Sequence, residues 1–511
     1  MLLCSVLCFS ACGKKKGGLK TETVTSDKYR ITVACQSEQS ESKVLEVLAA
    51  AFEAKYPLYD IEIKTFTGKD FNNYMQTNFA NNIEKSPHIV WTADYNHAAW
   101  HRYFTDLRPF YERDLATTDY SLYHESMLDT ASLNGEFRPT ANYKGTFRAD
   151  KKDTATGQEY GSNHSQYGIY YAPRDYNKPA IICNTALIKE LDADYEKYMG
   201  SNLPEDYVSI EDRLTAIVAG ENWSELDDMF DYSRLIAERI NYVVDACINA
   251  GEIKRSNYWE TKYAMDLKLA WEPTYVTLLN AMGIETMFNA DGTLGLAKDS
   301  DKLQALHSKL YAVDRICNSD SADTDFATGY TFMKVVSRPV VLGIIDRFSQ
   351  TYGSASLQCV QIPVDDIAAG NSGYAINYYY SRQSVSVNGV TKSYLDICWD
   401  FIKFIITEEG QEVAGESGSN IPVLKSLLED GAWRHVPELE GMNHDAWIAG
   451  GALKQDWYNI YNYEVREKFR NVYQVFFAQF VKENYGEGSL ANLFTRVQQN
   501  HDNLQPKNNL R

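Results

Sequence analysis

Residues 29–66 read YRITVACQSEQSESKVLEVLAAAFEAKYPLYDIEIKTF, and this stretch decides the fold class. Its first segment, YRITVAC, alternates in polarity and is rich in β-branched residues, which is typical of a strand. The next segment, SKVLEVLAAAFEAKY, carries apolar residues at helical spacing and is ended by Pro57. IEIKTF, which begins at Ile61, predicts a second strand. The order strand, helix, strand indicates a parallel pair connected by a helix.

The same alternation continues after Phe66. FNNYMQTNFANNIEK (residues 71–85) predicts a helix, and HIVWTA (residues 88–93) predicts a third strand. Residues 134–166 have no clear period and predict a loop, whereas YGIYYAPRDYNKPAIICN, from Tyr167, predicts two short strands. We therefore expect an α/β fold with a mostly parallel sheet flanked by helices.

The remaining segments extend this pattern over the rest of the chain. They predict several amphipathic helices from Leu187 to Met282, a tight turn in NADGT (residues 289–293), strands in FMKVVS, PVVLGII and VQIPV, one helix over residues 394–414, and a mostly helical tail over residues 457–504.

The composition is that of a globular chain with more than one folding unit. Of its 511 residues, 44% are hydrophobic and 23% are charged, too apolar for a disordered polypeptide. The formal net charge of −19 repels phosphate backbones and anionic lipids. We therefore expect no nucleic-acid partner. The 36 Tyr and 9 Trp combine flat apolar faces with polar tips, so we expect some of them at a ligand site.

The amino terminus indicates export. Residues 1–11, MLLCSVLCFSA, are apolar but too short to span a bilayer, and they predict the end of a signal peptide whose start is truncated. FSAC followed by Gly13 resembles a bacterial lipobox, which makes Cys12 the lipidated residue. Residues 12–27 then predict a flexible, lipid-anchored tether. An incidental cysteine on a frayed terminus is the alternative.

Six cysteines would remain in the mature chain, and none forms a CxxC pair. Their spacings are wide, and Cys183 and Cys398 lie inside apolar runs. We expect buried free thiols and neither a disulfide framework nor a zinc site.

Signatures of common enzyme classes are absent from the sequence. It contains no GxSxG, HExxH or GxxxxGK[ST] motif. His97 and His101 have the spacing of metal ligands on a helix, but no third ligand is evident. Asp365 and Asp366 are neighbours along the chain and point apart, so we interpret them as solvated loop charge. We expect no catalytic residues, no metal and no cofactor.

The order of segments resembles the family 1 extracellular solute-binding proteins of ABC importers, relatives of the maltose-binding protein. AAAFEAKYPLYDIEIKTF, PHIVWTADY, and YGIYYAPRDYNKPAIICNTALI with Asn184 are similar to family segments in the same order. The most specific match is GYAI followed by WDFIKFIITEEGQEVAGESGSNIPVLKSLL. Together these segments extend the resemblance over nearly the whole chain.

The resemblance implies two α/β lobes joined by a hinge of several crossings, residues 28–176 with 374–430 and residues 177–373 with 431–511. It implies a monomer that binds a small solute, most often a sugar or oligosaccharide, between the lobes and delivers it to a membrane permease. The protein would lie at the outer face of the bacterial cytoplasmic membrane, held there only by its lipid.

Ligands of open α/β sheets bind beyond the carboxyl ends of strands. With the resemblance, this rule places the following residues at the ligand: Gln36, Ser37, Trp91, Asp94, Arg174, Tyr176, Asp346 and Arg347. Asp346 and Arg347 depart from the aromatic pair of sugar-binding relatives and leave room for a charged ligand or an internal ion pair. Two other hypotheses about function stay open: the protein is a secreted carbohydrate-active enzyme, or it is a surface lipoprotein that binds a protein or peptide through its tyrosines.

Overall fold

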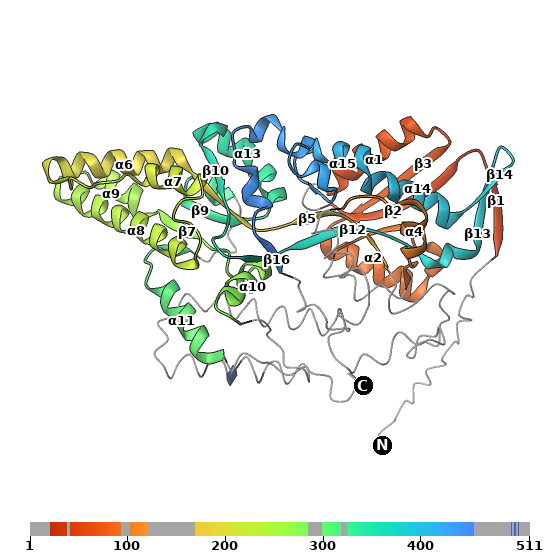
Figure 1. Cartoon of the computed structure of the whole chain (residues 1–511), viewed down its shortest axis with the longest axis horizontal. Helices are drawn as coiled ribbons and strands as arrows, with labels where there is room; N and C mark the ends of the chain where they lie inside the picture. The colour runs from red at the N-terminus through yellow and green to blue at the C-terminus, as the bar shows by residue number, and fades with distance from the viewer. Residues whose placement is uncertain are drawn as a thin grey trace, which may run out of the picture.

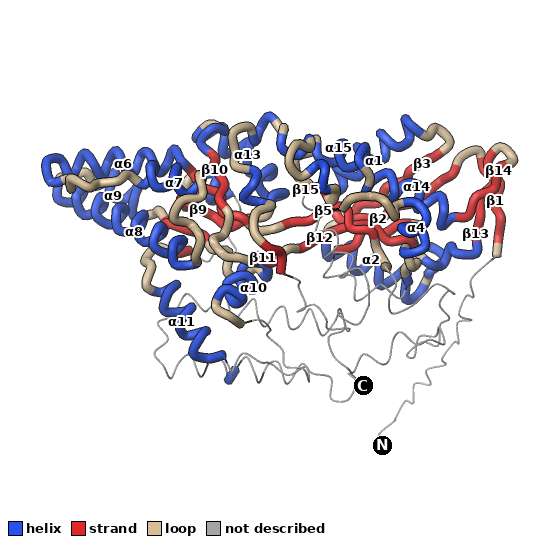
Figure 2. The backbone as a smooth tube through the Cα atoms, viewed as in Figure 1, coloured by secondary structure: helices blue, strands red, loops and turns tan. Residues whose placement is uncertain are grey.

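The structure is a computed structural model, which describes residues 21–37, 41–93, 103–120, 169–284, 299–317 and 324–453, together with residues 492, 495, 496 and 499. Two β-sheets, each with its own helices, form two lobes that lie side by side along the longest axis of the molecule (Figure 1). Figure 2 shows the strands of each sheet among surrounding helices. The expected α/β, two-lobed fold class is confirmed.

A six-stranded sheet with the order β15-β5-β12-β4-β2-β3 forms the first lobe. β2 pairs in parallel with β3 and β4, as the sequence predicts, whereas β12 runs antiparallel to β4 and β5. Apolar side chains of the sheet and of its helices form one buried core. The strands are β2 (Tyr29–Gln36), β3 (Tyr59–Phe66), β4 (Ile89–Ala93), β5 (Ala172–Asn177), β12 (Gly370–Ile376) and β15 (Ile421–Pro422), and the helices are α1 (Glu41–Lys55), α2 (Gly68–Asn81), α4 (Arg108–Asp114), α14 (Tyr394–Ile406) and α15 (Glu408–Gly415).

A five-stranded sheet with the order β10-β6-β9-β7-β8 forms the second lobe. β6 runs antiparallel to β10 and β9, and β7 runs parallel to β9 and β8. The strands are β6 (Ala180–Asn184), β7 (Tyr263–Asp266), β8 (Ile316–Cys317), β9 (Thr331–Val336) and β10 (Leu357–Val360), and the helices are α6 (Thr185–Met199), α7 (Ile210–Val218), α8 (Leu226–Asn249), α9 (Ile253–Glu260), α10 (Glu272–Ala281), α11 (Ser300–Tyr311), α12 (Thr324–Ala327) and α13 (Arg338–Tyr352). β7 is a strand inside the stretch predicted to be helical.

Within the part of the chain that the structure describes, three passages connect the lobes. β5 continues into β6 through Lys178 and Pro179, and β11 (Asp366–Ala368) continues into β12 through Ala369. β5 and β12 extend across the middle of the molecule in Figure 1. The third passage follows β15, after which Trp433 and Trp447 pack with α13 in a separate buried cluster. The lobe boundaries given by the resemblance remain predictions.

A small three-stranded sheet corrects the expected tether. β1 (Glu22–Ser26) pairs in parallel with β13 (Gln383–Val387), which also pairs with β14 (Val390–Ser393). The prediction of a flexible segment up to residue 27 is therefore wrong over β1. Its β-branched residues Thr23, Val24 and Thr25 suit a strand, and Thr23 Oγ1 lies 2.7 Å from Ser384 Oγ.

Two further element predictions are wrong. PVVLGII is not a strand, because it lies within α13: Pro339 occupies its first turn, and Val341, Ile344, Ile345 and Phe348 are buried at helical spacing. The single helix predicted over residues 394–414 is two helices, α14 and α15, separated at Thr407, whose backbone is extended.

Five of the described cysteines are buried free thiols, as expected: Cys35, Cys183, Cys247, Cys359 and Cys398. Cys317, in contrast, is only half-buried. The predicted loop, the turn at residues 289–293, nearly all of the predicted helical tail, Cys12, His97 and His101 lie outside the described residues. None of the described helices combines the length and the apolar character that crossing a membrane requires.

Candidate functional site

The strand register fixes which edge of the first sheet faces the second lobe. β12 is antiparallel to β4, with Ser372 opposite Ala93. β12 is also antiparallel to β5, with Gly370 opposite Asn177 at the point where the chain leaves for the second sheet. The carboxyl ends of β2 and β4 therefore lie at the edge from which the crossings depart.

The second sheet presents the corresponding edge. Ala180, the first residue of β6, pairs with Val336, the last residue of β9, so β9 ends beside the crossing. β7 is parallel to β9, with Asp266 opposite Lys334, and therefore ends on the same side. The carboxyl ends of the parallel strands in both sheets thus face the other lobe, the position where open α/β sheets bind ligands.

A buried ion cluster lies at this edge of the first sheet. Arg174 Nη2 is 2.6 Å from Glu41 Oε2 and 2.6 Å from Asp175 Oδ2, and it donates to Ser372 Oγ at 3.2 Å. The Tyr374 hydroxyl donates to Glu41 Oε1 at 2.7 Å. Since Glu41 opens α1, the cluster joins that helix to both crossing strands, β5 and β12.

Arg174 occupies an irregularity in the pairing of β5 with β12. Asp175 pairs with Ser372 and Pro173 pairs with Gly373, so Arg174 is the extra residue of a bulge. Its carbonyl accepts a hydrogen bond from Gln411 Nε2 of α15 at 2.9 Å. Its Nε and Nη1 groups are buried and have no hydrogen-bond partner among the described residues, so they keep donor capacity for a ligand or water.

Burial and neighbouring charges decide the electrostatics of this cluster. The pKa of Glu41 is raised above its ordinary value, mainly because the carboxyl group is buried. The charge of Arg174 acts to lower this pKa, and the charge of Asp175 acts to raise it further. Burial acts to lower the pKa of Arg174, but Asp175 and Glu41 outweigh it and raise that pKa. Burial also raises the pKa of the nearby Cys35 thiol to about 12. Arg174 therefore stays charged, and Cys35 stays a neutral thiol.

The other residues predicted in the first lobe lie around this edge. Gln36, at the end of β2, and Trp91, on β4, are buried, and Trp91 lies edge-on to Phe71 at 5.9 Å between ring centroids. Trp91 pairs with Tyr374 across β4 and β12, and the Tyr374 hydroxyl bonds Glu41, so Trp91 lies beside the ion cluster. Ser37 is exposed, and its N–H donates to the Phe66 carbonyl at 2.7 Å.

Tyr176 is fully buried and directed away from the ion cluster. Its hydroxyl donates to the Trp447 carbonyl at 3.3 Å, in the cluster that joins the crossings. Asp94 lies outside the described residues, so its role stays a prediction.

The structure does not place Asp346 and Arg347 at a strand end. Both residues lie on the exposed face of α13, because the segment before them is helical. The helical period turns them away from the buried side chains Ile344, Ile345 and Phe348. The premise that assigned them to a ligand is wrong.

Sequence reasoning missed the residues that do follow a second-lobe strand. Asp266, at the end of β7, forms a buried ion pair with Lys334 at 2.6 Å, and Trp271, five residues later, is the N-cap residue immediately before α10. Trp271 is half-buried, with the Lys268 ammonium 5.2 Å from its ring centroid. YAMD, four residues from Tyr263, is a weak strand signal inside a helical region, so the aromatic residue after it was not recognised.

Glu41 was also missed by sequence reasoning, since its partners lie far away along the chain.

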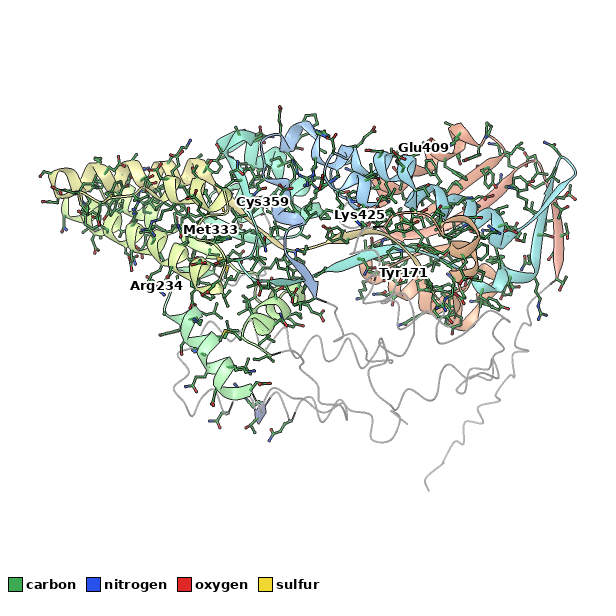
Figure 3. All side chains as sticks on the ribbon, viewed as in Figure 1. Tyr171, Arg234, Met333, Cys359, Glu409 and Lys425 are labelled. Atoms are coloured by element: carbon green, nitrogen blue, oxygen red, sulfur yellow. The ribbon has the colours of Figure 1, made fainter. Side chains whose placement is uncertain are left out.

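Figure 3 labels Tyr171 in the first lobe and Met333 and Cys359 in the second, so side chains of the two sheets can be located on the ribbon. The Tyr171 hydroxyl, on the residue immediately before β5, donates to Asn371 Oδ1 of β12 at 2.6 Å. Among the described residues, no group of three or more His, Cys, Asp or Glu side chains could hold a metal ion.

No family model matches the sequence, and no curated protein matches it. Solved structures do match: the chain has the two-lobed fold of the extracellular solute-binding proteins of ABC transporters. One such structure is maltose-bound MalE3 of T. maritima, with a TM-score of 0.57 and 12% identity over 92% of this chain and 99% of that one.

Two other solved structures are similar to the same extent. An ABC transporter solute-binding protein of Thermotoga lettingae TMO, bound with α-D-tagatose, has a TM-score of 0.56 and 12% identity over 94% of this chain and 100% of that one. An extracellular solute-binding protein of family 1 has a TM-score of 0.57 and 12% identity over 93% and 99%. At such identities, the similarity is one of fold.

Proposed function

We propose that this protein binds a carbohydrate between its lobes and delivers it to the permease of an ABC importer. One observation carries the proposal: the carboxyl ends of the parallel strands in both sheets face the opposite lobe. A solute held there contacts both lobes, so binding energy can favour their approach.

The side chains at the two edges suit a sugar. Trp271 at the start of the second-lobe helix α10 is half-buried and supplies aromatic surface on which the C–H faces of a sugar ring can stack, whereas Trp91 is buried at the edge of the first lobe. Gln36, Glu41 and Arg174 supply donors and acceptors for hydroxyl groups. Charged donors and acceptors make stronger hydrogen bonds than neutral ones and fix the orientation of a polyol.

The ligands of similar structures agree with this choice. The T. maritima protein is described as bound to maltose, and the T. lettingae protein as bound to α-D-tagatose. We infer a mono- or oligosaccharide as the ligand of this chain. We keep Asp94 in the proposed site. On the second lobe, we assign Trp271 to the site and no longer assign Asp346 and Arg347 to it.

A calorimetric titration with mono- and oligosaccharides tests the proposal. One sugar should bind, and Trp271→Ala should weaken its binding about tenfold or more, a loss of about 1.4 kcal/mol. The matched control is Tyr311→Ala, which removes an exposed aromatic ring from α11 of the same lobe and should leave affinity unchanged. If no sugar binds, or if both variants bind alike, the proposed site is refuted.

The same sample distinguishes binding from catalysis. We propose that the protein binds its ligand without altering it, so the sugar should be recovered intact after long incubation. Release of new reducing ends in proportion to enzyme and time would favour a carbohydrate-active enzyme instead.

The proposed role requires a location outside the cytoplasm. We propose that Cys12 carries the lipid that holds a monomeric protein at the outer face of the membrane, beside its permease. Cys12→Ala should move the protein from the membrane fraction to the soluble fraction. If that variant stays with the membrane, the anchor is a different one.

A further inference from the structure

Lys178 lies in the first crossing, between β5 and β6, and its side chain is buried. Its ammonium donates to the Ala449 carbonyl, to the Gly450 carbonyl at 3.1 Å and, at 3.5 Å, to the Gly451 carbonyl. An ammonium has three donors and no acceptor, so a set of backbone carbonyls matches it well. One crossing is thereby bonded to a chain segment more than 270 residues later.

That later segment is itself fixed to the second crossing. β16 (Gly451–Leu453) pairs in parallel with β11, which leads through Ala369 into β12. The Gly451 N–H donates to the Asp365 carbonyl at 2.7 Å. A Cβ at Gly451 would lie 1.8 Å from Asp366 Oδ1, a side-chain atom that can rotate away, and 3.4 Å from the Asp365 carbonyl oxygen, so the two segments are in ordinary contact here. Lys178 therefore connects both crossings through residues 449–451.

The contacts of Lys178 depend on its charge. Burial lowers the pKa of Lys178 to about 8, and Asp366 acts in the opposite direction. Asp366 on β11 is a charged group that acts on this ammonium, and Tyr176 on β5 is a titratable group bonded to the same loop through the Trp447 carbonyl. A neutral amine has one donor fewer and makes weaker hydrogen bonds than an ammonium.

We propose that Lys178 is a positioning residue that fixes the angle between the lobes by bonding the first crossing to the second. Without these bonds, the two crossings can twist independently, and the unliganded protein samples a wider range of lobe angles. This inference concerns the hinge and does not depend on which solute is bound.

Distances between spin labels in the unliganded protein test the proposal. One label is placed at the exposed Val47 on α1 and the other at the exposed Asp346 on α13, each as a cysteine, in a background with Cys317→Ser and the three amino-terminal cysteines replaced by serine. Lys178→Met keeps the aliphatic stem and removes the donors, so it should broaden or shift the distance distribution between the lobes.

The control is Lys189→Met, the same change at a side chain that is 59% exposed on α6 of the second lobe. It should leave the distance distribution as in the parent. If Lys178→Met and Lys189→Met give the same distribution as the parent, the proposal is overturned.

The pH dependence of the distance distribution in the parent protein is a second measurement. It distinguishes a positioning role of Lys178 from a general effect on stability, and it can be made even if the Lys178→Met variant does not fold. In the parent protein, raising the pH should broaden the distribution with a midpoint near pH 8, where Lys178 loses its charge. Lys178→Met should show no such transition. A parent distribution that is constant from pH 6 to pH 10 would overturn the proposal even if the variant were unfolded.

Discussion

Arg174 is the residue through which the first lobe holds its two crossing strands and α1 together. It is fully buried, and its two carboxylate partners, Glu41 and Asp175, are buried as well. Arg174→Met would leave both carboxylates without their counter-charge. Breaking a buried ion pair by removing one partner costs about 3–5 kcal/mol, so urea unfolding should show a loss of that size.

An exposed arginine in the same lobe gives the control. Arg30 bonds Asp60 at 2.6 Å, but its side chain is 61% exposed. Solvent screens exposed ion pairs, so Arg30→Met should leave the free energy of unfolding nearly unchanged. Equal losses in the two variants would mean that the cluster around Arg174 does not stabilise the lobe.

His88 makes the stability of the first lobe dependent on pH. Its Nδ1 accepts a hydrogen bond from the Thr32 N–H at 2.9 Å, and its ring stacks on Tyr394 at 4.6 Å between centroids. Burial, with Lys64 as a second cause, lowers the His88 pKa from 6.5 to about 3. Between these values the unfolded state binds more protons than the native state, so stability rises with pH.

The stability due to neutral His88 is therefore complete above pH 6.5 and is lost as the pH falls toward 3. We expect about 4–5 kcal/mol of acid destabilisation from this residue, measured by urea unfolding at several pH values. His88→Gln keeps an acceptor without titrating and should flatten that part of the profile. His435→Gln, at a side chain that is 64% exposed, should not; if it flattens the profile equally, the assignment to His88 is wrong.

Single residues were predictable from sequence only where position along a strand was informative. Trp91 and Arg174 could be assigned to strands because they lie in recognisable strand patterns, and their role at a ligand stays a prediction. Glu41 was not predicted, because its contact with Arg174 joins residues 133 positions apart. Asp346 and Arg347 were misplaced because a short apolar run such as PVVLGII fits a buried strand as well as a helix.

At the scale of elements, two glycines in helices test how α13 and α15 pack. Gly343 lies on the exposed side of α13, and a Cβ there would have no atom within 4 Å. Gly343→Ala should raise the free energy of unfolding by up to about 1 kcal/mol, because alanine has the higher helix propensity. Gly410 in α15 differs, because a Cβ there would lie 2.0 Å from the Phe404 carbonyl oxygen.

Gly410→Ala should therefore lower the free energy of unfolding by about 1–3 kcal/mol, since backbone would have to shift at the junction with α14. Both values come from the same urea titrations. If Gly410→Ala stabilises the protein as Gly343→Ala does, the tight contact between α14 and α15 is not present in solution.

Elements with a strong local period were predictable, and those decided by distant contacts were not. β2, α1, β3, α2 and β4 follow their apolar patterns closely. The separation of α14 from α15 depends on the close approach of Gly410 to the end of α14, which no period reveals. β1 became a strand only by pairing with β13, more than 350 residues later.

At the scale of the whole molecule, the two-lobed arrangement was expected from the order of segments. Its geometry was not available from sequence, because it depends on long-range pairing: Tyr374 of β12 lies opposite Trp91 of β4, and Lys178 bonds residues 449–451. These pairings direct both sets of strand ends toward each other and connect the crossings that must bend when the lobes move.

The central claim is that a sugar binds between the lobes and draws them together. Small-angle X-ray scattering on the protein alone, and then saturated with the sugar that calorimetry identifies, tests this claim most directly. Since the ligand binds the closed arrangement more tightly than the open one, the radius of gyration should decrease at saturation. A radius that stays constant while the sugar is demonstrably bound would contradict the claim and would place the ligand on a single lobe.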